Sequence, residues 1–141
     1  MAYGVYASGT GSVLNAENVN ITTSGDVGDA AWAYAGGVLN LNGGTYNILG
    51  EQNSNSPHEN ANGLIAVGGT ATTDGGVINA ENLVINTTGA DSYGFRAGAV
   101  VGNEQTFGTI DLKNTTITAS GENAYIGRFS MAAHSRSRIP H

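Results

Sequence analysis

Short stretches in which apolar and polar residues alternate recur along most of the chain. In four of them, 11–25, 36–50, 75–89 and 107–121, the apolar positions are spaced two, then three, then two residues apart. A spacing of two places side chains on one face of a strand. The step of three indicates one extra residue at a corner between two strands. Because no segment has the i, i+3, i+4, i+7 spacing of an amphipathic helix, we expect an all-β chain.

The residues at the four expected corners are of only two kinds. They are Asn18, Gly43, Asn82 and Asn114. Asn and Gly enter the left-handed backbone region at the lowest cost. The pattern therefore predicts a left-handed residue at each corner.

Like residues also stand at like positions when the four stretches are aligned. The columns, in chain order, are the apolar Leu14, Leu39, Ile78, Ile110; the polar Asn15, Asn40, Asn79, Asp111; and the mixed Glu17, Asn42, Glu81, Lys113. Stacked amide side chains hydrogen-bond from one strand to the next. The polar column therefore predicts an amide ladder with a structural role.

A shorter strand is expected before each stretch, at 3–7, 31–35, 63–67 and 93–97. Aligning Ala7, Ala35, Ala66 and Ala97 gives steps of 28, 31 and 31 residues, and a fifth copy begins at 124–127. A unit of about 30 residues with three short strands cannot bury its own strands and becomes stable by stacking on its neighbours.

Two all-β architectures remain, an antiparallel meander or sandwich and a parallel β-solenoid. Hairpins would bring two-residue turn signals of the Asn-Gly type between strands, and these occur only at Asn42-Gly43 and Asn62-Gly63. Recurrence of like residues favours the solenoid. We predict a right-handed parallel β-helix of about four coils over residues 1–127.

Composition and charge narrow the function classes. Gly accounts for 22 of 141 residues, yet 40% of the chain is hydrophobic, which is too much for a typical disordered segment. Cys is absent, which excludes disulfides and thiolate chemistry, and no apolar run is long enough to span a membrane. Residues 1–127 carry a net charge of −9, which argues against nucleic-acid binding.

The last fourteen residues differ from the rest of the chain. Segment 128–141 carries three arginines, no carboxylate side chain and no match to the repeat. Two interpretations of this basic tail stay open: it is foreign to the natural sequence, or it covers one end of the fold.

Segments such as 2–7 and 108–125 resemble the coils of autotransporter passenger domains, the pertactin-like proteins of type V secretion. The resemblance covers about residues 1–127 and implies a right-handed β-helix displayed outside a Gram-negative cell. It further implies a role in adhesion, self-association or display of other domains. A signal peptide and a translocator barrel are both missing from the sequence. We therefore expect a fragment of a longer precursor.

Two candidate recognition surfaces depart from the regular pattern. One is the apolar-free loop at 50–62, with the candidate binding residues Gln52, Asn53, Asn55, His58 and Glu59; a merely tolerated, solvated loop is the alternative. The other is an exposed strip formed by Tyr6, Tyr34 and Arg96, stacked with Ile65. If the inward–outward phase is off by one residue, this strip belongs to the core.

An enzymatic alternative rests on carboxylates. Inverting glycoside hydrolysis needs two of them about 6.5–9.5 Å apart, and stacked coils could bring Glu17 and Glu81 together with neighbouring Asp111. The alternative is that the column with Glu17 and Glu81 only faces solvent, where charge aids solubility.

We expect a non-enzymatic chain with no catalytic, cofactor-binding or metal-binding residues. Its expected partners are a host-surface protein or glycan, or a second copy bound through the open ends. The alternative is a truncated carbohydrate-active β-helix.

Overall fold

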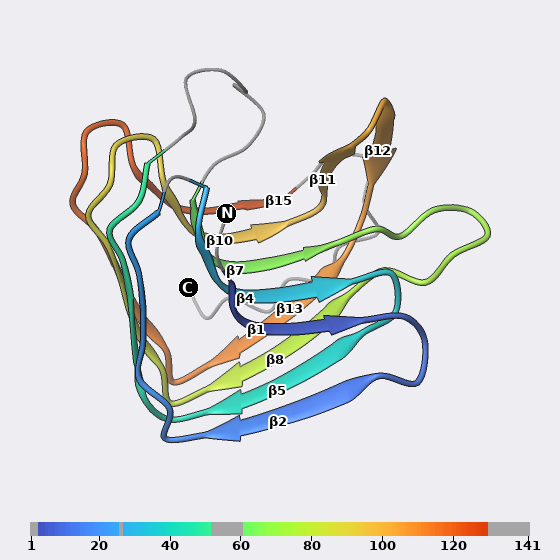
Figure 1. Ribbon diagram of the computed structural model, residues 1–141, viewed down its shortest axis with the longest axis horizontal. Helices are drawn as coiled ribbons and strands as arrows, with labels where there is room; N and C mark the ends of the chain where they lie inside the picture. Colours follow the sequence, from blue (N-terminus) through green and yellow to red (C-terminus); the bar gives the residue numbers. More distant parts are fainter. Residues whose placement is uncertain (1–2, 26, 52–60, 130–141) are drawn as a thin grey trace.

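The computed structural model describes residues 3–25, 27–51 and 61–129. Over these residues the chain is all-β and winds into a parallel β-helix, which confirms the predicted fold class. Figure 1 shows the successive coils lying side by side, with strands of the same kind in register from one coil to the next. The described part contains no helix, and so none long and apolar enough to cross a membrane.

Each complete coil contains three strands that stack. The first coil has β1 (Tyr3–Ser8), β2 (Val13–Glu17) and β3 (Ile21–Thr23); the second has β4 (Asp29–Tyr34), β5 (Val38–Asn42) and β6 (Thr45–Ile48). The third has β7 (Asn62–Val67), β8 (Val77–Glu81) and β9 (Val84–Thr87). The fourth has β10 (Tyr93–Ala97), β13 (Thr109–Lys113) and β14 (Thr116–Ala119), and β15 (Tyr125–Phe129) begins a fifth.

Stacking of the coils produces three parallel sheets. The first sheet has the order β1-β4-β7-β10-β15, the second β13-β8-β5-β2 and the third β14-β9-β6-β3. In the second sheet Leu14, Leu39, Ile78 and Ile110 follow one another in register, as the aligned columns predicted.

The four predicted corners are confirmed. Asn18, Asn82 and Asn114 have φ values of 53°, 57° and 45°, and Gly43 has a φ of 75°. Each lies between a strand of the second sheet and one of the third. A left-handed residue at this point turns the chain between the two strands of each stretch.

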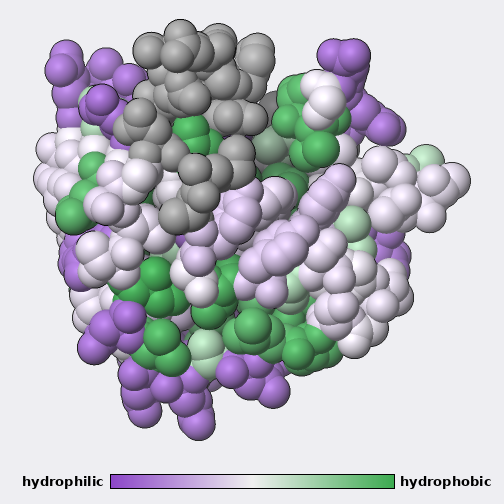
Figure 2. All heavy atoms as spheres, viewed as in Figure 1, coloured by the Kyte–Doolittle hydropathy of each residue, from purple (hydrophilic) through white to green (hydrophobic). Residues whose placement is uncertain are grey.

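The core fills the space between the sheets and is tightest in the middle coils. Leu39, Ile78 and Ile85 are fully buried. In the first coil Val13 is 58% exposed, and Figure 2 shows hydrophobic atoms gathered between β1 and β2. The second and third coils therefore contribute most of the burial that stabilises the stack.

Tyr46 is the exceptional member of this core. Its side chain is fully buried, and within the described residues its hydroxyl has no hydrogen-bond partner. Burial raises the pKa of Tyr46 to about 12. An unpartnered buried hydroxyl reduces stability, since it has lost its contacts with water without replacement.

The register of the first sheet differs from the prediction in one strand. Ala7 pairs with Ala33, not with Ala35, and Ala33 pairs with Ala66. Ala35 has a left-handed φ of 48° and lies in the turn after β4. The alanines at alternate positions in this strand permit a shift of two residues without changing which side chains face inward.

A short antiparallel hairpin interrupts the fourth coil. β11 (Ala99–Val101) pairs with β12 (Glu104–Thr106) between β10 and β13. The residues after this hairpin lie beside the segment that follows β7, because Gly69 and Phe107 form an antiparallel bridge.

The boundary of the basic tail also needs correction. β15 includes Arg128 and Phe129, which pair with Arg96 and Ala97 of β10. These two residues therefore belong to the β-helix. Residues 130–141 lie outside the described part, and both interpretations of the tail stay open.

Candidate functional site

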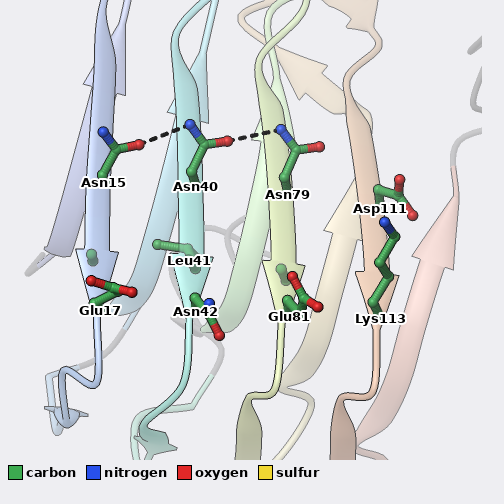
Figure 3. Close-up of a pocket in the computed structure, with 11 residues that line it drawn as sticks. Asn15, Glu17, Asn40, Leu41, Asn42, Asn79, Glu81, Asp111 and Lys113 are labelled. Atoms are coloured by element: carbon green, nitrogen blue, oxygen red, sulfur yellow. Dashed lines mark hydrogen bonds between the residues drawn. The ribbon is translucent and has the colours of Figure 1, made fainter.

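The outer face of the second sheet carries a polar groove. Its volume is about 540 Å³, and its walls are two rows of side chains that run across the strands (Figure 3). The first row is Asn15, Asn40, Asn79 and Asp111, and the second is Glu17, Asn42, Glu81 and Lys113. Between the rows the strands β2, β5, β8 and β13 form the floor.

The first row contains the predicted amide ladder. The Nδ2 of Asn40 donates to the Oδ1 of Asn15 at 2.9 Å, and the Nδ2 of Asn79 donates to the Oδ1 of Asn40 at 2.9 Å. In Figure 3 these three amides point the same way, from one coil to the next. Their orientation is therefore fixed by the stack before any ligand arrives.

Two further ladders were not predicted. The Nδ2 of Asn86 donates to the Oδ1 of Asn47 at 3.1 Å in the third sheet. At the corner, Asn82 donates to the Oδ1 of Asn42 at 3.0 Å and accepts a bond from Asn114. The available signal was the recurrence of Asn at 47 and 86 in one column and at 82 and 114 in the corner column, whereas Asn42 lies in the column of Glu81.

The second row brings together the carboxylates of the enzymatic alternative. The register places Asn42 between Glu17 and Glu81, so the two acids are two strands apart. At a strand spacing of about 4.8 Å, that separates their backbones by roughly 9.6 Å, at the upper limit for inverting hydrolysis. Lys113, in the next coil, extends toward Asp111 in Figure 3.

An aromatic cluster lies on the first sheet. The Trp32 ring is 4.6 Å from Tyr3, 4.9 Å from Tyr6 and 5.7 Å from Tyr34, measured between ring centroids. Tyr6 is 43% exposed and Tyr3 is 36% exposed, while Trp32 and Tyr34 are half-buried. We call these four residues the aromatic patch. Aromatic side chains bury large areas at low entropic cost, which suits a binding surface.

The predicted exposed strip is therefore only partly correct. Tyr6 is exposed, but the residue paired with it is Trp32, because Tyr34 pairs with Ser8. Arg96 is buried, with 9% of its surface exposed, and lies 5.3 Å from the centre of the Tyr93 ring. Burial lowers the pKa of Arg96. Arg96 is thus part of the packing of the first sheet.

Trp32 and Tyr3 were missed by the sequence analysis. The shifted alignment moved Trp32 out of the column of Tyr6, and Tyr3, at the start of the predicted strand 3–7, was not assigned to a surface. The four aromatic residues within 3–6 and 30–35 were the available signal, because each strand of the first sheet stacks directly on the next.

The predicted binding loop is not described. Gln52, Asn53, Asn55, His58 and Glu59 all lie outside the described residues, so their role stays a prediction. Among the residues that the structure does describe, no group of three or more His, Cys, Asp or Glu side chains could hold a metal ion.

Comparison with known proteins gives no match: neither a protein-family model, nor a curated protein, nor a solved structure is similar to this chain.

Proposed function

We propose that the chain is a non-enzymatic, extracellular β-helix segment of the autotransporter passenger type. It acts in adhesion or as a display scaffold, and its ligand is a host-surface protein or glycan. The repeat resemblance and the parallel stacking of three sheets support this assignment.

The observation that carries the proposal is the aromatic patch on a rigid wall. Tyr6 and Trp32 come from neighbouring coils, and their positions are set by backbone pairing between β1 and β4. Such a surface binds with little loss of conformational entropy, because its rings are held before contact. Aromatic side chains also dominate the binding energy of many interfaces.

Binding of the fluorescently labelled chain to cultured animal cells tests the adhesive part. Trp32→Ala and Tyr6→Ala are expected to reduce cell binding at least about fivefold, equivalent to roughly 1 kcal/mol each. Thr118→Ala, an exposed change on the third sheet, is the matched control and should bind normally. Absence of cell binding, or equal binding by all variants, would contradict the proposal.

The flanking coding sequence tests the secretion assignment separately. The autotransporter assignment expects a signal peptide upstream and a translocator barrel downstream. A gene in which this segment adjoins neither would contradict it, whatever the result with cells.

The polar groove favours one alternative, a truncated carbohydrate-active β-helix that uses Glu17 and Glu81. Release of reducing sugar from a panel of acidic and neutral polysaccharides, lost in Glu81→Gln, would establish this alternative and overturn the non-enzymatic assignment.

A further inference from the structure

The groove of the second sheet offers a ligand site that is separate from the aromatic patch. Its volume of about 540 Å³ falls within the range of small-molecule sites, roughly 300–1,000 Å³. Its two walls run from coil to coil, parallel to the stacking direction (Figure 3). A ligand that fills it is therefore elongated and lies across the strands.

The amide wall retains hydrogen-bonding capacity after the ladder is made. A primary amide has two N–H donors and two acceptor sites. Asn40 uses one donor with Asn15 and one acceptor with Asn79. At least one N–H and one acceptor site per amide thus remain for hydroxyl groups, at intervals of about 4.8 Å.

In the opposite wall a glutamate recurs at every second coil, and the row ends at Lys113, whose side chain extends toward Asp111 (Figure 3). Glu17 and Glu81 are both exposed, and the neutral Asn42 lies between them. Within the described residues neither carboxylate has a hydrogen-bond or ion-pair partner. The net charge of −9 over residues 1–127 further favours a cationic ligand.

We propose that the groove binds a β-1,4-linked glucosamine chain lying along the axis of the β-helix. In an extended β-1,4 chain each sugar is turned over relative to the last, so the same edge recurs at every second sugar. The advance per sugar is close to the strand spacing of about 4.8 Å. Amino groups two sugars apart therefore meet Glu17 and Glu81.

The remaining contacts follow from the same placement. The sugar hydroxyls bond to the free donors and acceptors of the amide wall, and the sugar between the two acids faces Asn42. Charge-assisted hydrogen bonds from ammonium to carboxylate are roughly twice as strong as neutral ones. The two glutamates therefore discriminate between free and N-acetylated amino groups. This proposal does not rest on cell binding by the aromatic patch.

Titration calorimetry with the full chain at mildly acidic pH tests the proposal. The ligands are the β-1,4 tetramer of glucosamine, its fully N-acetylated form, and spermine as a cation of different shape. We expect the glucosamine tetramer to bind best. Glu17→Gln and Glu81→Gln are each expected to weaken it about three- to tenfold.

Glu104→Gln is the matched control, because Glu104 is exposed on β12 and does not line the groove. It should bind the tetramer normally, and unchanged circular dichroism should show that all variants fold. Equal affinity for the N-acetylated tetramer, equally tight binding of spermine, an equal loss in Glu104→Gln, or no binding would each overturn the proposal.

Discussion

The second and first sheets are both built by parallel stacking of coils, but their outer faces differ in chemical character. Across the second sheet one outward column reads Asn15, Asn40, Asn79 and Asp111, and side-chain hydrogen bonds join its three amides. The equivalent column of the first sheet reads Tyr6, Trp32, Ile65, Arg96 and Arg128. A column of repeated amides therefore makes the strand register of the second sheet visible in the sequence. The outward residues of the first sheet vary from coil to coil, so only its turns define the register of its strands.

This difference explains where sequence reasoning succeeded. The second and third sheets were aligned correctly because a repeated corner residue, Asn or Gly, fixes the position of both strands in each stretch. In the first sheet, Ala31, Ala33 and Ala35 are interchangeable under a shift of two residues. Only the turn at Ala35, with its left-handed φ, decides among them.

The candidate sites were less predictable than the fold. The groove residues were aligned correctly, but neither the groove nor the free bonding capacity of its amides was deduced. Burial of Arg96 could not be inferred from its column, because Tyr6 in that column is exposed. Burial depends on what packs over the strand, and a repeat does not encode that.

The largest expected effect tests how closely neighbouring coils approach at the corner. A Cβ at Gly44 would lie 2.0 Å from the carbonyl oxygen of Val19, at a φ of 107°. Gly44→Ala should reduce the free energy of unfolding by roughly 4 kcal/mol or more, measured by urea denaturation. Gly25→Ala meets no atom within 4 Å and should change it by less than about 0.5 kcal/mol. Equal losses would refute close stacking.

The next effect compares the middle of the second sheet with the last strand of the first. Ile78 is fully buried, whereas Ile126 in β15 is 58% exposed. Ile78→Ala should cost roughly 2–4 kcal/mol of unfolding free energy, because it leaves a cavity. Ile126→Ala should cost less than about 1 kcal/mol. A similar loss for both would mean that β15 is packed as tightly as the centre.

Alkaline titration tests the buried Tyr46 of the third sheet. The pKa of Tyr46 is about 12 in the folded chain and 10.0 in the unfolded chain. The folding free energy that depends on a neutral phenol at this position is therefore fully present below pH 10. As pH rises to 12 the unfolded chain loses a proton that the folded chain keeps, and roughly 2–3 kcal/mol of stability is lost. Tyr46→Phe should remove this part of the pH dependence. At neutral pH it should equal or exceed the wild type by up to about 1 kcal/mol, because the unpartnered hydroxyl is removed.

The smallest effect isolates the amide ladder itself. Asn40→Ala removes two side-chain hydrogen bonds and Asn15→Ala removes one. We expect losses of roughly 1 kcal/mol and about half that, measured by urea denaturation. Ile65→Ser changes an outward residue of the first sheet that takes part in no amide ladder, and its loss of unfolding free energy is the comparison for the two Asn variants. Equal losses at positions 40 and 15 would show that the ladder contributes nothing beyond each side chain alone.

Disulfide formation between introduced cysteines tests the central claim, the stacked register, most directly, because the chain contains no other Cys. Tyr6→Cys with Trp32→Cys places the two Cα atoms about 4.8 Å apart, within disulfide reach, whereas Tyr6→Cys with Tyr34→Cys places them about 8 Å apart. Asn40→Cys with Asn79→Cys is the positive control from the second sheet. The account predicts rapid oxidation of the first and third pairs and little of the second. Preferential oxidation of the pair at positions 6 and 34 would contradict it.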